Sequence, residues 1–465
     1  MNRYKKLIGN SIIFAIGNLG SKLMQFIMVP LYSYTMTTSQ FGQTDIITTV
    51  ISLLAPVVSL EVFDAVFRFA MDKQANQARL LTTGMTITSI TSILTGVIGL
   101  ILQRLWPQEY FFLGALILIS TIFYSLISNY VRAIGYSKRF AVAGMVNTFF
   151  MVVLNVILLA VLHLGIVGYF VSLLVGLLSA ILFLLLTTKE LLVGLNLTKY
   201  DHEVARSMIL YGLPLIPNAL SWWLNSASDR MFILALVGYS ANGLYAMANK
   251  IPNALSVVTN IFFQSWQISA VEEYNSKDAD FFISRILTFF MYVLFIGSLV
   301  ILIIVKPIFR LMIDPSYFTA WRVTPFILLS LIYSSLSGFL GTIYTATKRT
   351  GPIFLTTFYG AIINVIASYF FIKAFGIYGA ALANVTSFLV VMFLRYRQIK
   401  SDGKVHLRWF DILACHLAYL TYSIVLLAFS NDLIVYGLGL LIILVMVVIN
   451  WSKIKPFISR ADCKK

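Results

Sequence analysis

Residues 165–188, GIVGYFVSLLVGLLSAILFLLLTT, decide the fold class of this chain. The stretch carries no charged side chain, and its length exceeds the roughly 20 residues that a helix needs to cross a bilayer. Similar segments recur along the chain, and they have to be helical because backbone groups in lipid must hydrogen-bond within the segment. The sequence predicts fourteen spans, at 7–34, 43–69, 80–103, 111–133, 140–163, 165–188, 206–236, 241–269, 282–305, 322–346, 352–374, 376–397, 409–429 and 432–451.

The composition leads to the same class. Of the 465 residues, 59% are hydrophobic and 11% are charged, whereas a soluble domain is about half apolar and a quarter charged. This excludes an ordinary soluble enzyme, a disordered chain and a disulfide-stapled secreted module. Cys415 and Cys463 are the only cysteines and the four histidines are scattered, so no disulfide framework, metal site or catalytic triad is expected.

The basic residues predict the topology. When the 34 Lys and Arg are assigned to alternating sides of fourteen spans, 26 lie on the side of the termini, six lie on the other side and two lie within spans. Because cytoplasmic loops are rich in Lys and Arg, both termini are predicted to be cytoplasmic. The net charge of +16 is therefore mostly a topology signal, and nucleic-acid binding is not expected. The first segment is too long for a signal peptide, so we expect it to be retained.

The chain contains an internal repeat. The groups Lys138-Arg139, Asn155-Val-Ile and Gly165-Ile-Val-Gly168 recur 209 to 211 residues later as Lys348-Arg349, Asn364-Val-Ile and Gly376-Ile-Tyr-Gly379. Chance similarity of short apolar motifs is the alternative explanation. Transporters often build a central site between repeated halves. We therefore predict an all-α fold with two pseudo-symmetric six-helix lobes, 1–200 and 201–400, around a central cavity, with two peripheral spans and a basic tail in 401–465.

Charged side chains within the first two spans are candidate functional groups, because a charge near the bilayer centre costs roughly 2.5–3.5 kcal/mol. Helical spacing is expected to place each set on one face. The sets are Asn18, Lys22 and Gln25 in the first span, and Glu61, Asp64 and Arg68 in the second. Two hypotheses remain open. The groups form a structural network, with Asp64 paired to Arg68 and Glu61 to Lys22, or they line a water-filled cavity.

A second polar cluster lies in the seventh and eighth spans. The seventh carries Asn218, Trp222, Asn225 and Asp229, with Arg230 adjacent. The eighth carries an expected single stripe of Asn242, Tyr245, Asn249, Asn253, Ser256, Asn260, Gln264 and Gln267, with Lys250 beside it. Hydrogen bonding between helices explains one or two such residues. A stripe along a whole span favours a hydrated cavity wall, and amides with aromatic faces suit sugars.

Several short motifs resemble a known family. The run Gly17-Asn-Leu-Gly20, Pro30-Leu-Tyr-Ser33, Gln40-Phe-Gly42 and Arg68-Phe69 resembles the opening of polysaccharide-repeat flippases (Wzx-like) in the multidrug/oligosaccharidyl-lipid/polysaccharide exporter superfamily. Asn364 and the run Phe375-Gly-Ile-Tyr-Gly-Ala-Ala-Leu-Ala383 resemble its second-lobe signature. The resemblance implies that an undecaprenyl-(di)phosphate-linked oligosaccharide is moved from the inner to the outer leaflet by alternating access, for surface polysaccharide synthesis. It also implies polysaccharide polymerase and chain-length proteins as partners.

The residues fit such a cargo, which combines an anionic phosphate, a polar glycan and a lipid tail. Four cations are candidates to neutralise phosphate through charge-assisted hydrogen bonds, namely Lys22, Arg68, Arg230 and Lys250. The amide and aromatic residues are candidates to contact the glycan. Glu61, Asp64 and Asp229 are candidates for coupling to protons, sodium or the membrane potential. No cofactor and no catalysis is expected, because flipping breaks no bond.

Three other functions are alternatives to a flippase. A cation-coupled drug or metabolite antiporter of the same fold would favour an acidic, aromatic cavity, which the lysines and arginines disfavour. An integral membrane glycan polymerase or ligase would need a sizeable external loop with clustered charged residues, and the sequence shows neither. A scaffold protein would leave the intramembrane charges unexplained.

Overall fold

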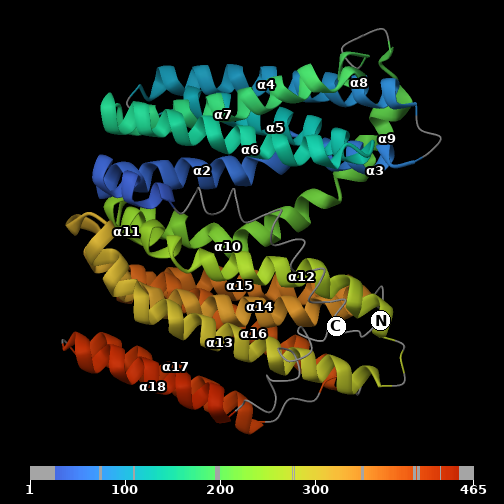
Figure 1. Ribbon diagram of the computed structural model, residues 1–465. Helices are drawn as coiled ribbons and strands as arrows, with labels where there is room; N and C mark the ends of the chain where they lie inside the picture. The colour runs from blue at the N-terminus through green and yellow to red at the C-terminus, as the bar shows by residue number, and fades with distance from the viewer. Residues whose placement is uncertain are drawn as a thin grey trace, which may run out of the picture. The chain divides into compact units, whose positions relative to one another are not determined.

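The computed structural model describes residues 27–72, 76–107, 110–193, 199–274, 276, 278–346, 350–401, 405, 409–429 and 431–449 (Figure 1). Every regular element in these ranges is a helix, which confirms the predicted all-α class. Ten of the described helices, counting joined segments as one, are long and apolar enough to cross a membrane. The protein is therefore a multi-pass membrane protein.

Four of the fourteen predicted spans are not among these ten. Most of the segment 7–34 lies outside the described residues. The segment 206–236 is divided between α9 (His202–Gly212) and α10 (Leu215–Leu236). The segment 241–269 was wrongly predicted as one continuous helix, because it forms α11 (Tyr239–Lys250) and α12 (Asn253–Glu273) with Pro252 between them. The last segment is a shorter apolar helix.

The helices group into two compact units. The N-terminal unit, Leu23–Arg230, contains α2 to α9 and most of α10. Its helices not yet given bounds are α2 (Thr38–Val58), α3 (Val62–Ala70), α4 (Gln77–Leu105), α5 (Phe111–Ala133), α6 (Ser137–Asn155), η1 (Val156–Val161), α7 (Gly165–Thr187) and α8 (Lys189–Val193). Residues 27–35 are helical as well. The lobe boundaries predicted from the repeat, at 200 and 400, remain predictions.

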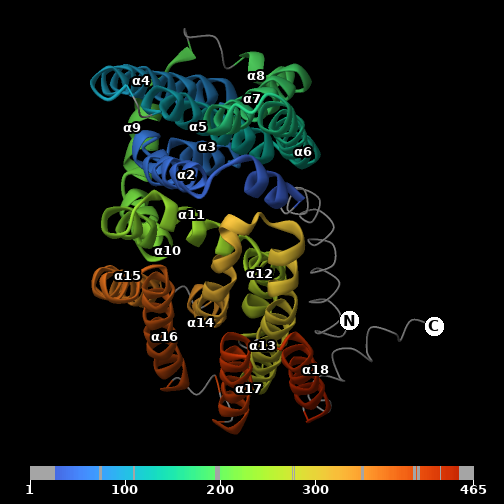
Figure 2. The same ribbon diagram turned by 90° about the vertical axis from the view of Figure 1, so that its left-hand side faces the viewer.

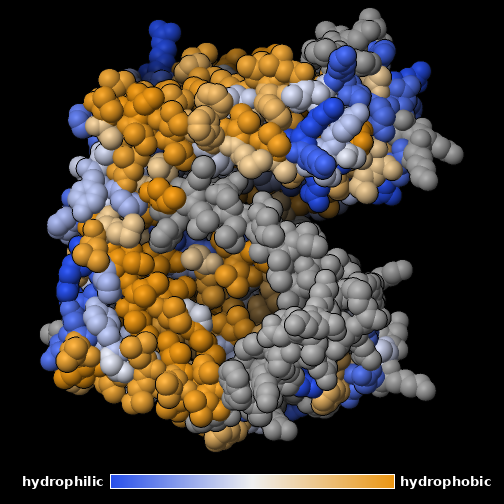
Figure 3. All heavy atoms as spheres, in the orientation of Figure 1, coloured by the Kyte–Doolittle hydropathy of each residue, from blue (hydrophilic) through white to orange (hydrophobic). Residues whose placement is uncertain are grey.

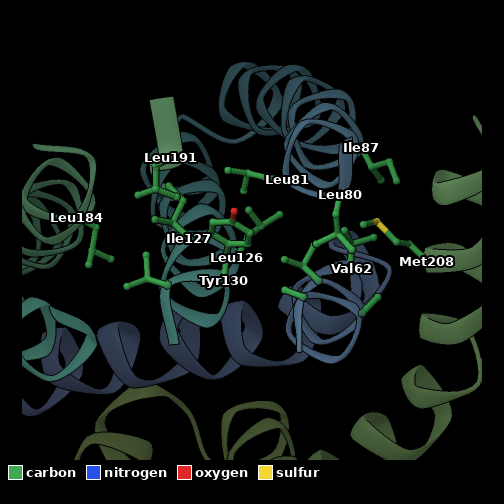
Figure 4. Packing of buried hydrophobic residues seen from close by; sticks show 14 of the residues in the cluster. Val62, Leu80, Leu81, Ile87, Leu126, Ile127, Tyr130, Leu184, Leu191 and Met208 are labelled. Atoms are coloured by element: carbon green, nitrogen blue, oxygen red, sulfur yellow. The ribbon is translucent and has the colours of Figure 1, made fainter. Parts of the chain in front are cut away.

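The core of the N-terminal unit joins α3, α4, α5, α7 and α9. Val62, Leu81, Leu126, Leu184 and Met208, one from each of these helices, are almost fully buried against one another (Figure 4). This packing holds the start of α3 close to α9. It therefore fixes the short connection between α2 and α3, where predicted site residues lie.

The C-terminal unit, Met231–Lys465, contains the remaining helices. Those not yet introduced are α13 (Ala279–Met312), η3 (Pro315–Val323), α14 (Thr324–Ala346), α15 (Thr350–Phe375), α16 (Ile377–Ser401), α17 (Trp409–Ala428) and α18 (Asp432–Ile449). The last two pack against α13 (Figure 2). Lys306 and Arg310 of α13 hold the start of α18 through Asp432, at 2.6 and 2.7 Å.

Apolar side chains cover much of the surface of each unit (Figure 3). On α4, Ile93 is 65% exposed and Leu94 is 59% exposed, and on α18 Leu433 is 84% exposed. Water-soluble proteins rarely expose large apolar patches. Contact with lipid accounts for this surface.

The repeated glycine motif has the same role in both units. Gly165 and Gly376 adopt left-handed φ angles of +52° and +57° at the start of α7 and α16. Three residues later, Gly168 and Gly379 face the preceding helix of each hairpin. A Cβ on Gly168 would lie 3.1 Å from the Cβ of Leu158, and one on Gly379 would overlap the backbone carbonyl of Phe371. Close approach of two helices is thus the reason for the second glycine of the motif.

The repeated asparagines also have comparable contacts. Asn155 Nδ2 donates a hydrogen bond to the hydroxyl of Tyr32 over 3.1 Å. Asn364 Nδ2 donates to Asn384 Oδ1 over 2.7 Å, and Asn384 Nδ2 donates to the Tyr245 hydroxyl over 3.2 Å. In each unit a buried asparagine is therefore linked to a buried tyrosine near the start of the chain segment that forms that unit.

We predict that Gly379→Ala destabilises the protein by about 1–3 kcal/mol, because the added methyl group forces α15 and α16 apart. The measurement is thermal unfolding of the purified protein in detergent. Gly351→Ala is the matched control, since a Cβ there meets no atom within 4 Å. Equal melting temperatures for the two variants would contradict the role given to close helix contact.

Candidate functional site

The candidate site in the N-terminal unit lies along the contact between α2 and α10. Helix α2 begins with a capping box, in which Thr37 and Gln40 each accept a hydrogen bond from the other's backbone N–H. From this start, Asp45, Thr49 and Ser52 follow at steps of four and three and share one face of the helix. That face contacts α10.

Two side chains of α10 meet this face. Arg230 Nε donates a hydrogen bond to Asp45 Oδ2 over 2.9 Å. About two turns away, Trp223 Nε1 lies 3.1 Å from the carbonyl oxygen of Thr49 and 3.2 Å from the hydroxyl of Ser52. The two helices therefore run antiparallel along what we name the α2–α10 seam, which comprises Asp45, Thr49, Ser52, Trp223, Asp229 and Arg230.

The charges of the seam are largely removed from solvent. The side chains of Arg230 and Asp45 are 19% and 18% exposed, and that of Asp229 is 2% exposed. Asp229 Oδ1 accepts a hydrogen bond from the backbone N–H of Arg230 and lies 3.5 Å from its Nη1. One guanidinium thus lies between two carboxylates, which together more than offset its charge.

Sequence analysis found two of the three charged residues in the seam and missed Asp45. The signal was present, because Asp45 is an acidic residue within the predicted span 43–69. Trp223 was also missed, since Trp222 was chosen on the helical spacing instead. The hydrogen-bond partners of Trp223 come from α2, and the spacing within α10 carries no information about them.

Glu61, Asp64 and Arg68 do not share one helical face, contrary to the prediction. Leu60 and Glu61 both have left-handed φ angles, of 51° and 55°, and these interrupt the helix between α2 and α3. Glu61 is buried, at 5% exposure, whereas Asp64 and Arg68 are exposed on α3. The ion pair recorded for Arg68 is with Asp72, at 2.9 Å, and not with Asp64.

The interruption is held by packing from α9. A Cβ added to Gly212 would overlap the backbone carbonyl of Leu60, so the end of α9 lies directly against the strained residues. Left-handed φ angles are unfavourable for leucine and glutamate and persist only where the surroundings impose them. Glu61 Oε2 is buried and has no hydrogen-bond partner among the described residues.

The predicted amide stripe of the eighth span is divided between two helices and two environments. In α11, Asn242 and Tyr245 are buried, at 0% and 2% exposure. In α12, Asn253, Asn260 and Gln267 are exposed, and so the single face expected from a continuous helix does not exist. Asn249 Nδ2 donates to the carbonyl oxygen of Tyr245 over 2.8 Å. The break at Pro252 rotates one half of the stripe relative to the other.

The remaining predicted site residues are placed only in part. Lys250 lies in the last turn of α11 and is half-buried. Asn18, Lys22 and Gln25 lie outside the described residues, as do the side chains of Asn218, Trp222, Asn225 and Gln264. Of the predicted site residues, Asp229 and Arg230 therefore belong to the α2–α10 seam. The roles of the other candidates remain predictions.

A buried arginine in the C-terminal unit was not recognised from the sequence, where it was counted with the loop cations. Arg395 of α16 is 4% exposed. Its guanidinium donates to Thr356 Oγ1 over 3.0 Å, to Thr357 Oγ1 over 2.9 Å and to the carbonyl oxygen of Ser337 over 2.8 Å. Among the described residues no carboxylate lies within 4 Å of it. The positive charge of Arg395 is thus stabilised by neutral oxygen atoms of α14 and α15.

Outside the spans, charged side chains fix connecting segments of the N-terminal unit. Asp201 caps α9 and pairs with Arg79 of α4 at 3.3 Å. The Tyr136 hydroxyl donates to Glu190 over 2.7 Å, and this hydrogen bond lowers the pKa of the Glu190 carboxyl because it stabilises the ionised form.

The fold defines the class of protein. The structure is similar to that of the lipid II flippase MurJ in an inward closed conformation, with a TM-score of 0.70 at 12% identity, covering 95% of this chain and 99% of that chain. It is also similar to a multidrug resistance MATE family transporter of the MOP superfamily, with a TM-score of 0.63 at 13% identity, covering 85% and 99%. The chain therefore shares the fold of these two proteins.

The sequence then identifies the family. Residues 7–268 match the model of the family described as polysaccharide biosynthesis protein. This is more than half of the chain, so the chain belongs to that family, and the resemblance found in its motifs is confirmed. It is also 27% identical over 275 residues to Lsg locus putative protein 1 of Haemophilus influenzae (strain ATCC 51907 / DSM 11121 / KW20 / Rd), a match that covers 54% of this chain and 63% of the relative. The match thus spans less than two thirds of that relative.

We predict that Asp45 and Arg230 are energetically coupled by about 1 to 3 kcal/mol. Removing Arg230 leaves Asp45 without the counterion seen in this structure, and removing Asp45 takes away the shorter of the two ion pairs of Arg230. The measurement is a double-mutant cycle on thermal unfolding in detergent, with Asp45→Asn, Arg230→Gln and the double variant. Arg68→Gln serves as the control, since it removes an ion pair whose side chains are 53% and 59% exposed. We expect that control to change stability by less than about 0.5 kcal/mol. Additive effects of Asp45→Asn and Arg230→Gln would rule out the coupling.

Proposed function

We propose that the protein is a flippase that moves undecaprenyl-(di)phosphate-linked oligosaccharide repeat units from the inner to the outer leaflet of a bacterial cell membrane by alternating access. The match of residues 7–268 to the polysaccharide biosynthesis family carries this proposal. Similarity of fold to a lipid II flippase over 95% of the chain supports it. Polysaccharide polymerase and chain-length proteins are the partners expected from this function.

The α2–α10 seam supplies a place for the anionic part of the cargo. In this structure Asp45 and Asp229 balance Arg230, so a phosphate group would have to compete with two carboxylates for one guanidinium. Protonation of a carboxylate, or a change in the spacing of α2 and α10, would release Arg230 for the phosphate. Glu61, Asp64 and Asp229 remain the proposed coupling residues, for protons, sodium or the membrane potential.

A cation-coupled drug or metabolite antiporter is the second candidate, because the MATE transporter fold is also similar. The two candidates differ in the charge of the cargo. An antiporter for cationic drugs would use the seam carboxylates, whereas a flippase for lipid-linked glycans would use the cations.

We predict that proteoliposomes of this protein move a fluorescent polyprenyl-diphosphate oligosaccharide between leaflets, and that Arg230→Gln and Lys22→Ala reduce the rate at least about tenfold while both variants remain inserted. Access of a membrane-impermeant lectin to the glycan measures the movement. Arg206→Gln, at an exposed position of α9, is the matched control and keeps the wild-type rate. Movement of ethidium driven by a cation gradient, without movement of the glycolipid, would favour the antiporter.

We further predict that the termini are cytoplasmic, as the distribution of Lys and Arg indicates. In a Cys415→Ala, Cys463→Ser background, cysteines at Lys138 and at Lys400 should react with an impermeant thiol reagent only from the cytoplasmic side. A cysteine at Lys373 should react only from the opposite side. Labelling of all three positions from one side would contradict the topology.

A further inference from the structure

A pocket of about 480 Å³ lies in the C-terminal unit, where the ends of several helices meet. Its lining comes from η3, the start of α14, the end of α15, the start of α16 and the end of α17. The lining residues are Arg322, Phe326, Phe375, Tyr378, Leu382 and Leu427. The volume is within the usual range of small-molecule sites, roughly 300–1,000 Å³. One cation and five largely apolar side chains thus surround a space of ligand size.

Arg322 carries an unbalanced charge at this pocket. It is exposed, and no carboxylate of the described chain lies within 4 Å of it. Its guanidinium lies over the ring of Trp321, 5.8 Å from the ring centroid, and this aromatic contact steadies the side chain without neutralising it. The pocket therefore offers an anion a guanidinium with free hydrogen-bond donors.

The six cations that the sequence assigns to the side opposite the termini fall into two groups. Arg230 pairs with Asp45, and Lys306 and Arg310 share Asp432. Arg104, Lys373 and Arg322 are exposed and form no ion pair among the described residues. Of these three, Arg322 lines the pocket.

The surroundings place the pocket at the depth of lipid headgroups. It is formed where transmembrane helices begin and end, and Trp321 and Tyr378 are of the residue types that gather at the membrane–water interface. The ring of Tyr378 packs edge-on against Phe326, with the centroids 6.1 Å apart. Its hydroxyl forms no hydrogen bond within the described chain, so it is available to a polar ligand group. Phe375, Leu382 and Leu427 provide the apolar walls.

We propose that this pocket binds an anionic phospholipid of the bilayer, with the phosphate at Arg322 and Tyr378 and part of an acyl chain against Phe375, Leu382 and Leu427. A free sugar would need several amide or hydroxyl partners, which the lining does not provide. A free inorganic phosphate would leave the apolar walls exposed to water. An amphiphile with one anionic group satisfies both parts of the lining, and this site is independent of the transported cargo.

The test uses the purified full-length protein and phosphatidylglycerol with a photoactivatable acyl chain, compared with the same probe built on phosphatidylcholine. Crosslinked peptides are mapped by mass spectrometry. We expect phosphatidylglycerol to label the peptides that contain Phe375, Leu382 or Leu427 at least about tenfold more than phosphatidylcholine does. Phosphatidylglycerol brings a net negative charge to Arg322, whereas the quaternary ammonium of phosphatidylcholine offsets its phosphate.

Two variants and one control localise the effect. Arg322→Gln should remove the preference for phosphatidylglycerol at these peptides, and Leu382→Trp, which fills the pocket but keeps the arginine, should reduce labelling by both lipids. Lys373→Gln removes an exposed cation near the end of α15 that does not line the pocket, and should keep the preference. Equal labelling by the two lipids in the wild type, or an unchanged preference in Arg322→Gln, would overturn the proposal. A loss of preference in Lys373→Gln equal to that in Arg322→Gln would do the same, since it would reduce the effect to general surface charge.

Discussion

The constraint on which this structure depends is that a polar group surrounded by lipid has to find its partner within the protein. Water cannot compensate a charge or an amide at that depth, and each unsatisfied group costs several kcal/mol. The chain satisfies the constraint in two ways. Arg230 and Lys306 are balanced by carboxylates, whereas Asn364, Asn384 and Tyr245 form a chain of neutral hydrogen bonds. The pairs Arg230–Asp45, Lys306–Asp432 and Asn384–Tyr245 join helices that are distant in sequence, so groups that are costly in lipid also specify which helices pack together.

The same constraint explains why the candidate site lies at the α2–α10 seam. Asp45 and Asp229 permit an arginine to be buried between two helices, and this balanced group is also one that a charged cargo or a proton can disturb. A fully apolar contact would also hold the helices together, but neither a charged cargo nor a proton would disturb it. The strained connection at Leu60 and Glu61, pressed by Gly212 of α9, lies in the same unit and contains a buried carboxylate oxygen without a partner. The strained connection and the group of Asp45, Asp229 and Arg230 therefore lie in the same unit as the residues proposed for coupling.

Hydropathy predicted the membrane class and ten of the fourteen spans, because these features depend on segment length and local composition. The internal repeat pointed to the paired glycines. Hydropathy failed where a helix breaks or where a partner helix decides the orientation. The interruption at Leu60 and Glu61 contains no glycine or asparagine, the residues that usually adopt left-handed φ angles. Its cause is the close packing of α9 at Gly212. Pro252 did give a signal, yet the amides on both sides of it were treated as one stripe. Asp45 was not predicted, because its importance depends on its ion pair with Arg230. The two residues are far apart in sequence, and the spacing of residues within one span does not show this contact.

Arg395 has a mechanical consequence for the second unit. Its guanidinium hydrogen-bonds to α14 and α15 from α16, and within the described chain no carboxylate accompanies it. If any one of the three helices moved away, the buried guanidinium would lose hydrogen-bond acceptors. These hydrogen bonds therefore favour movement of α14, α15 and α16 together.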